Sequence, residues 1–330
     1  MRCAALAAPC VLSLLLAGCP GSEPPPALNG PYLGQSPPGT EPTLFAPGLI
    51  STGGQELSIC FSPDGGELYL LVTGPVYTPR HLLHSHMDPD GWTDLAEVSF
   101  CSPDRQDGYA FVAPDGKRIF FNSSRPYVGA PERRHGILWY VDRTAQGWGE
   151  PMRVRFGEDD CAEGSFPSVA ANGNLYFNAG GSVTGSDIYY AAYDGERYSA
   201  PIRLPDAVNS AGGDFHPFIA PDESYLLFDS IRNEDSYGSN DIYISFRNKD
   251  GSWSKAANLG APVNTEASDL RPFVTADGGY LFFVSNRRVE VDHPDLPLPA
   301  EDVRTLLDRP GNGHQDIYWV SAEVMPHPSP

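Results

Sequence analysis

The sequence predicts an all-β protein, a five-bladed β-propeller, from an internal repeat, its composition and one displaced strand. Residues 213–232 and 268–287 are identical at nine of twenty positions. Gly and Pro supply 67 of the 330 residues, and Tyr and Phe a further 32. Such a composition favours many short strands joined by turns over helices. The last repeat also lacks its final strand, and a matching segment stands near the N-terminus.

The repeat occurs five times, and each copy begins as a β-hairpin. An apolar strand leads into an Asp-Gly-type turn, and a second strand rich in Leu, Tyr and Phe follows. The turns recur every 50 to 57 residues, a period typical of propellers and other repeat architectures. The five turn residues are Asp64, Asp115, Asn172, Asp222 and Asp277.

Two further strands complete each unit. The third strand reads SDIYYAAY, NDIYISF and QDIYWVS in the last three copies. A fourth strand follows a turn, as in GWGEPMRV, ERYSAPIRL and GSWSKAANL. Four antiparallel strands make one propeller blade.

The two ends of the chain are expected to close the ring. The fifth unit stops after its third strand, while residues 43–50, TLFAPGLI, match the fourth-strand segment YSAPIRL. An N-terminal strand in the last blade leaves no sheet edge open to aggregation. A six-bladed ring is the alternative, but no stretch of the length of one blade is left to form it.

The N-terminus has the features of a bacterial lipoprotein. Arg2 precedes an apolar run over residues 4–16, which indicates a secretory signal peptide at 1–18. The sequence Leu-Ala-Gly-Cys ending at Cys19 resembles the lipobox, in which that cysteine is lipidated. We expect a Pro/Gly-rich tether at 19–42, the propeller at 43–324 and a disordered tail at 325–330.

The expected location is the bacterial cell envelope. Pro20 follows the lipidated cysteine where inner-membrane lipoproteins of enterobacteria carry Asp, and this favours the outer membrane. The net charge of −20 argues against nucleic acid, whose phosphates require clusters of Lys and Arg. We expect a monomer that contacts the membrane only through its lipid.

The strings APDGKRIFFNSSR and TADGGYLFFVSNR, with the third strands above, resemble the TolB-type, WD-like propeller repeat of bacterial envelope proteins. The resemblance covers residues 43 to about 324. It implies a propeller that serves as a scaffold for a partner, and it implies no particular activity. The additional domain and the six blades of TolB itself have no counterpart here.

An acidic residue stands eight positions before the turn in four units, and Glu163 lies close to that place in the third. These carboxylates could ring one mouth of the central channel and hold a cation such as Ca²⁺, or a sugar. Alternatively each one caps the junction between loop and strand in its own blade. Arg125, Arg232 and Arg287 after the second strands suggest Arg–carboxylate pairs within the blades. The four acidic candidates are Glu56, Asp107, Asp214 and Asp269.

The residue two places after each acid varies in type, although its surroundings repeat. Alternation along a strand puts it on the same face as the acid, toward the channel. Different side chains in a constant frame are expected where a scaffold is fitted to one ligand, although simple packing of the channel is the alternative. The ligand-binding candidates are Tyr109, Phe166, His216 and Arg271, with Ser58 in the first unit.

These features favour a non-catalytic scaffold that recognises an envelope protein, peptide or glycan through one mouth of the propeller. The alternative is a carbohydrate-active enzyme that uses the acids of the mouth as its catalytic carboxylates. Such an enzyme needs carboxylates in different environments, whereas equivalent positions of a repeat share one. No motif indicates an organic cofactor or a metal centre.

Two other features stand outside the repeat. Cys101 and Cys161 precede the first strands of adjacent blades and could form a disulfide in an oxidising envelope. A long insertion between Arg287 and Asp316 includes a predicted short helix at 300–308. We expect this insertion to form a partial lid over the acidic mouth.

Overall fold

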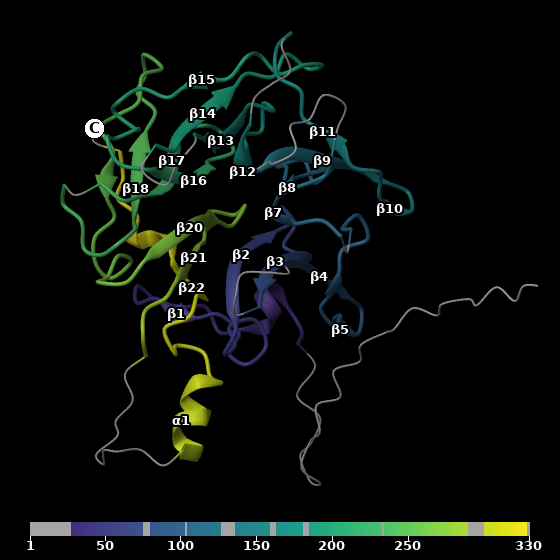
Figure 1. The fold of residues 1–330 in the computed structure, drawn as a ribbon, viewed down its shortest axis with the longest axis vertical. Helices are drawn as coiled ribbons and strands as arrows, with labels where there is room; N and C mark the ends of the chain where they lie inside the picture. Colours follow the sequence, from purple (N-terminus) through teal and green to yellow (C-terminus); the bar gives the residue numbers. More distant parts are fainter. Residues whose placement is uncertain are drawn as a thin grey trace, which may run out of the picture.

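Five antiparallel sheets stand around one axis in the computed structural model, which describes residues 28–74, 80–102, 104–126, 136–158, 163–180, 185–232, 234–289 and 300–328. Figure 1 shows them as the blades of a ring. The five-bladed prediction is confirmed, and the six-bladed alternative is wrong because the repeats form five sheets. The strands nearest the axis are β2 (Gln55–Phe61), β7 (Asp107–Val112), β12 (Ser165–Val169), β16 (Asp214–Ile219) and β20 (Asp269–Val274).

Each inner strand forms the predicted hairpin with a second strand, and a third strand pairs beside it. The second strands are β3 (Glu67–Thr73), β8 (Arg118–Ser123), β13 (Leu175–Ala179), β17 (Tyr225–Ser230) and β21 (Tyr280–Ser285). The third strands are β4 (Arg80–Asp88), β9 (Ile137–Thr144), β14 (Asp187–Ala191), β18 (Asp241–Phe246) and β22 (Asp316–Ser321).

The outermost strands pair over only two residues each. They are β5 (Gly91–Trp92), β6 (Ala96–Glu97), β10 (Gly147–Trp148), β11 (Met152–Arg153), β15 (Ile202–Arg203) and β19 (Ala257–Asn258). Short edges of this kind offer little unpaired backbone to another chain. The described helical elements are the 3₁₀ turns η1 (Pro31–Gly34) and η2 (Ala322–Val324) and the helix α1 (Ala300–Leu307).

The hairpin turns explain why the repeat carries Asp or Asn at one fixed place. In every blade this side chain accepts a hydrogen bond from the backbone N–H two residues further on, at 2.9 to 3.1 Å. That bond satisfies a backbone donor and fixes the tight turn. Because the five blades are equivalent, all five turns lie on the same face of the ring. We name it the turn face.

The predicted ring closure is present. Strand β1 (Thr43–Leu44) pairs antiparallel with β22, and Thr43 lies opposite Trp319. Phe45 follows, fully buried, with its ring 5.0 Å from that of Phe282 and 6.0 Å from that of Phe61. It therefore joins the last blade to the first.

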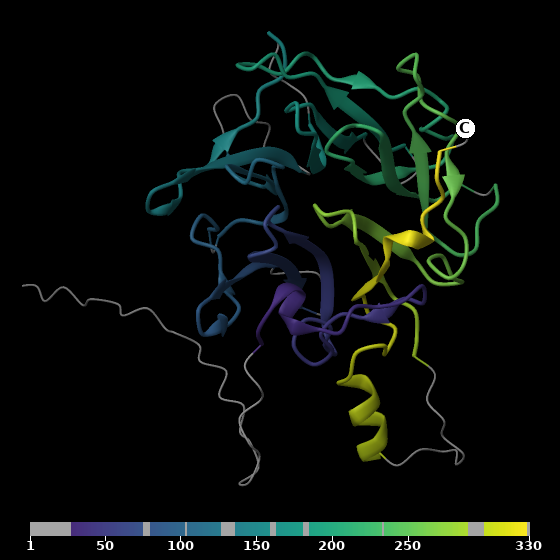
Figure 2. The ribbon, with the colours of Figure 1, turned by 180° about the vertical axis from the view of Figure 1, so that it is seen from behind.

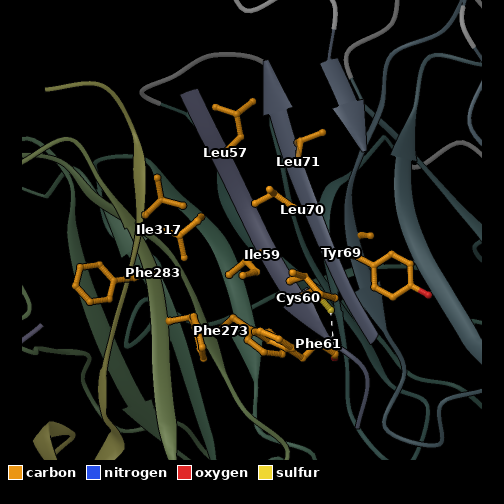
Figure 3. Packing of buried hydrophobic residues seen from close by; sticks show 14 of the residues in the cluster. Leu57, Ile59, Cys60, Phe61, Tyr69, Leu70, Leu71, Phe273, Phe283 and Ile317 are labelled. Atoms are coloured by element: carbon orange, nitrogen blue, oxygen red, sulfur yellow. Dashed lines mark hydrogen bonds between the residues drawn. The ribbon is translucent and has the colours of Figure 1, made fainter. Parts of the chain in front are cut away.

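The seam between these two blades is packed with apolar side chains. Figure 3 shows Ile59 and Phe61 of β2 facing Phe273 and Ile317 of the last blade, whereas the ring of Phe283 points away from β2. All five are at most 9% exposed. The hydrophobic contact along this seam supplements the few backbone bonds of β1.

The predicted tether is wrong for its last part, because residues 28–34 pack against the propeller. Leu33 is buried, and the Tyr32 ring lies 5.3 Å from Phe61 and 5.2 Å from Tyr280. In Figure 2 this purple turn lies on the near side of the ring. The expected tail also differs, since Met325 packs on the core. Apolar side chains inside a Pro/Gly-rich segment explain why it docks.

The insertion contains the predicted helix, but the helix is no lid. Figures 1 and 2 show α1 beside the ring rather than over its axis. The end of the insertion is held against the first blade, where Asn312 Nδ2 donates to the Gly53 carbonyl at 3.2 Å. Among the described residues, no helix is long and apolar enough to cross a membrane.

We predict that Phe45→Ala lowers the free energy of unfolding by about 3–5 kcal/mol, because it opens a cavity in the seam that closes the ring. The control is Leu49→Ala in the same segment, where the side chain is 42% exposed. Urea unfolding of the two variants provides the measurement. Equal effects of the two substitutions would show that the seam does not hold the ring closed.

Candidate functional site

The four acidic candidates do not ring an open mouth. Their exposed fractions are 0 to 3%, so the expectation of a carboxylate mouth that holds a cation or a sugar is wrong for these residues. Each instead caps the loop before its strand. Asp214 Oδ2, for example, accepts a hydrogen bond from the Ser210 backbone N–H at 2.6 Å. The equivalent bonds run from Ser102 to Asp107, from Thr265 to Asp269 and from Thr52 to Glu56.

Three of these acids are also neutralised within their own blade. Asp107 pairs with Arg125 at 2.7 Å, and Asp214 with Arg232 and Asp269 with Arg287 at 2.6 Å. In all three blades the same guanidinium also donates to a backbone carbonyl of the preceding loop. A carboxylate held in this way is part of the blade architecture and is not available to a substrate.

The first blade departs from this pattern. No described arginine pairs with Glu56, and its carboxyl group faces that of Asp316, also fully buried. Burial, with a smaller contribution from the charge of Asp316, raises the pKa of Glu56 to about 7. Burial likewise raises the pKa of Asp316. The two carboxyl groups therefore retain a proton between them beneath the end of the insertion, where the Gly311 N–H donates to Asp316 at 2.9 Å.

The four ligand-binding candidates converge on the axis. The rings of Tyr109 and Phe166 are 4.0 Å apart, and those of Phe166 and His216 are 3.9 Å apart. The guanidinium carbon of Arg271 lies 5.6 Å from the centre of the Tyr109 ring. These four side chains from adjacent blades, which we name the axial cluster, surround a small cavity together with Ser58.

All four residues adopt the same unusual backbone conformation. Their φ angles lie between 50° and 57°, the left-handed region that costs non-glycine residues roughly 1–2 kcal/mol. Each sits at a β-bulge, where the pairing of the inner strand shifts by one residue. A bulge changes the direction of a side chain and occurs often beside functional sites. Strain at four equivalent positions identifies this end of the channel as the candidate site.

Polar residues of the second strands support three of these bulges. The backbone N–H of Phe166 donates to Asn122 Oδ1 at 2.8 Å, and that of Arg271 donates to Asp229 Oδ1 at 3.0 Å. His216 has the equivalent bond to Asn178 at 3.3 Å. Sequence reasoning missed these residues. The sequence does contain a signal for them. The penultimate residue of the second strand is apolar in the first and fifth units but polar in the other three.

Asp229 also orients the imidazole of His216. His216 Nδ1 donates to Asp229 Oδ1 at 2.6 Å, and Asn240 donates to the other carboxylate oxygen at 3.1 Å. Burial lowers the pKa of His216 below its ordinary value and outweighs the opposite effect of Asp229, while the Arg271 charge lowers it further. The ring is therefore neutral at pH 7 and presents its other nitrogen as a hydrogen-bond acceptor.

The channel is closed below the axial cluster. Two residues further along their strands, Phe111, Phe218 and Phe273 meet with ring centres 5.7 to 6.4 Å apart. The cavity above them measures about 60 Å³. A single water occupies about 10–15 Å³ on this measure, so the cavity holds a few waters or a group of similar size. It is too small for a sugar ring in this arrangement of side chains.

The described residues contain no group of three or more His, Cys, Asp or Glu that could hold a metal ion. Cys60 and Cys101 form no disulfide with another described cysteine, and burial raises the pKa of each thiol to about 12. Cys161, the predicted disulfide partner of Cys101, lies outside the described residues, as does Cys19. Both predictions therefore stand untested.

The fold resembles solved propellers at low sequence identity. TolB from Acinetobacter baumannii has a TM-score of 0.46 and 11% identity, over 82% of this chain and 57% of that one. An oligogalacturonate lyase in complex with manganese has a TM-score of 0.39 and 14% identity, over 82% and 66%. A prolyl endopeptidase has a TM-score of 0.39 and 13% identity, over 72% and 32%.

The chain thus spans 32 to 66% of the length of these three proteins. The sequence matches no family profile, and a comparison with curated proteins gives no match. The strand pairing defines the class of protein, a five-bladed β-propeller whose fold can carry either binding or catalysis. It does not define the ligand.

We predict that Glu56→Gln stabilises the protein at pH 8 and has little effect near pH 4. The folded pKa of Glu56, about 7, exceeds its ordinary value, so the folded state binds more protons and wild-type stability falls as pH rises from about 4.5 to 7. The neutral amide avoids a loss of up to about 3 kcal/mol. Urea unfolding at both pH values measures this, with exposed Glu323→Gln as control. A pH-independent effect would contradict the shared proton.

We predict the opposite pH dependence for His216. Its folded pKa lies below the ordinary value, so the unfolded state binds more protons and wild-type stability falls as pH drops through about 6.5. The variant His216→Gln, which can still donate to Asp229, should lose less stability between pH 8 and pH 5. Urea unfolding at pH 5, 6, 7 and 8 tests this against the exposed control His327→Gln. Parallel pH profiles for wild type and His216→Gln would refute it.

Proposed function

We propose that this chain is a non-catalytic recognition module, lipid-anchored in a bacterial cell envelope, that binds a partner protein through the axial cluster. One observation carries the proposal. Four side chains of different chemistry are held at strained backbone positions around one mouth of the channel, which is closed beneath them. Packing alone does not require this strain, because the first blade fills the same place with Ser58 in an ordinary conformation.

Several observations favour binding over carbohydrate hydrolysis. The repeated carboxylates Asp107, Asp214 and Asp269, which the enzyme alternative requires, are buried and paired with arginines. The carboxylate closest to the axial cluster is Asp229, and its oxygens already accept three hydrogen bonds. A glycosidase needs one free acid and one free base or nucleophile at the bond to be cleaved.

The size of the cavity favours a protein partner over a glycan. About 60 Å³ admits the end of a side chain or of a peptide, whereas a sugar residue would have to bind outside it. The aromatic rings of Tyr109 and Phe166 pack on each other at 4.0 Å instead of forming a flat platform for a sugar. An extended peptide that inserts one small group therefore fits this end of the channel better.

The docked N-terminal segment supports an arrangement in which the site faces away from the membrane. Tyr32 lies at the turn face, where its hydroxyl contacts the turn residue Asp277 at 3.4 Å. The axial cluster lies at the opposite end of the inner strands. Eight residues stand between Leu28 and the predicted lipid at Cys19, and the nine Cα–Cα steps from one to the other can span about 30 Å at most. A lipid at Cys19 would thus hold the turn face toward the bilayer and leave the axial cluster accessible.

The test is capture of a partner by the full-length chain, tagged at its C-terminus, from crosslinked and detergent-solubilised envelopes of its own organism. We expect one protein, identified by mass spectrometry, whose recovery falls at least ten-fold for the double variant His216→Ala, Arg271→Gln. The matched control is Ile202→Ala, a side chain 52% exposed on the outer strand β15.

Two outcomes would overturn the proposal. One is a partner recovered equally with wild type, the double variant and the control, because its contact would then lie elsewhere. The other is recovery of glycan in place of protein, which would shift the function to carbohydrate binding. Circular dichroism and thermal unfolding of each variant separate loss of contact from loss of fold.

A further inference from the structure

We propose that the mouth above the axial cluster contains a subsite for a carboxylate group of a bound peptide, formed by the guanidinium groups of Arg80 and Arg271 beside Tyr109. The inference rests on the proposed function, since it names the chemical group that the same mouth recognises. It starts from two half-buried arginines that have no acidic partner in the part of the chain that the structure describes.

Arg271 comes from the bulge of β20, and its guanidinium carbon lies 5.6 Å from the centre of the Tyr109 ring. Its Nη1 donates to Gln315 Oε1 at 2.8 Å, a neutral acceptor at the end of the insertion. Its Nε is buried and has no hydrogen-bond partner. The nearby carboxylate of Asp229 accepts from the Arg271 backbone N–H and from His216 and Asn240, not from the guanidinium. The charge of Arg271 is therefore not paired directly.

Arg80 reaches the same tyrosine from another blade. It is the first residue of β4, and its guanidinium carbon lies 5.3 Å from the centre of the Tyr109 ring. Its Nε is also buried without a partner. Arg80 lines a second cavity of about 220 Å³, which shares Tyr109 and Phe166 with the axial cavity. The remaining lining is polar and comprises Gln106, Asn122, Ser123, Ser124, Gly136 and Ser165.

Other half-buried arginines show what is unusual about this pair. Arg125, Arg232 and Arg287 each contact a carboxylate oxygen at 2.6 or 2.7 Å. Among the described residues, no carboxylate forms an ion pair with Arg80 or Arg271, although the chain contains 42 acidic residues and only 22 basic ones. A buried guanidinium N–H without an acceptor is costly, and two like charges beside one ring repel each other. An anion bound beside the Tyr109 ring lowers both costs.

The geometry selects a carboxylate among possible ligand groups. A guanidinium presents a planar fork of donors that matches the two oxygens of a carboxylate. The axial cavity has room for such a group, and the second cavity has room for the residue that bears it. Neutral His216 can accept a hydrogen bond from a backbone N–H of the same peptide. The site thus suits a peptide terminus or an acidic side chain.

The experiment titrates the full-length chain in detergent micelles with two probes that differ only in charge. One is the tripeptide acetyl-Gly-Ala-Ala with a free carboxylate, and the other is the same tripeptide as its C-terminal amide. We expect the carboxylate peptide to bind wild-type protein with at least a ten-fold lower Kd than the amide, by calorimetry or NMR titration. Raising the salt concentration should weaken only the carboxylate peptide.

Substitutions then locate the subsite. We expect Arg271→Gln and Arg80→Gln each to weaken the carboxylate peptide at least ten-fold and to leave the amide unchanged. The matched control is Arg247→Gln, an exposed guanidinium that lies 5.2 Å from the centre of the Trp253 ring, outside the mouth. The wild-type comparison of the two peptides needs no variant, so a folding defect cannot obscure the result.

Equal affinity for the two peptides, or an unchanged preference in both mouth variants, would overturn the subsite. Tighter binding of glucuronate or inorganic sulfate than of the carboxylate peptide would overturn its assignment to a peptide. The proposed function can fail separately. Carboxylate binding that depends on Arg80 and Arg271, with no protein captured through the mouth, would refute the recognition module and leave the subsite intact.

Discussion

The rest of the structure depends on closure of the ring by the pairing of β1 with β22. Each blade packs only on its neighbours, so the geometry of the ring is fixed only when its first and last blades are joined. Here β1 and β22 pair over two residues. Phe45 then packs across the seam onto the rings of Phe61 and Phe282. The segment at 28–34 extends the same contact, since Tyr32 lies on Phe61 and Tyr280. Closure fixes the radius of the ring and hence the distances between side chains at its axis.

Within the closed ring, equivalent positions serve different purposes. The acids eight residues before the turn serve the blade to which they belong. Each caps a loop and, in three blades, also pairs with an arginine. The residues two places later are used across blades, since their rings contact each other and their backbone is bonded to the blade before. A position that keeps its residue type in most repeats thus serves the architecture of its own blade. A position whose residue type varies contributes to a feature that several blades form together. This distinction makes Tyr109, Phe166, His216 and Arg271 the candidate site.

The sequence was sufficient for features that depend on neighbouring residues in the chain. Turn residues, strand order, the helix near residue 300 and the closing strand all follow from local pattern and repeat alignment. It was insufficient for contacts that depend on how blades are rotated against one another. Alternation predicts Asp214 and His216 on one face, but the bulge after Phe215 separates them, with His216 at the axis and Asp214 buried at its loop. Arg80 opens the third strand of its blade, where three other blades carry Asp, so the repeat pattern did not predict an arginine beside Tyr109.

The electrostatics of the mouth follow from this combination of local and cross-blade contacts. Asp229 is committed to the bulge of the next blade and to His216, so its charge orients a neutral imidazole rather than neutralising Arg271. In the first and fifth blades the equivalent residues are Val72 and Val284, and that part of the axis has no such carboxylate. Two positive charges, those of Arg80 and Arg271, therefore lie 5.3 and 5.6 Å from the centre of the Tyr109 ring, within a chain whose net charge is −20. The negative net charge of the chain repels most anions at a distance, and the local positive charge attracts only an anionic group that can reach the axis. The mouth is thereby selective for a projecting anionic group over a broad acidic surface.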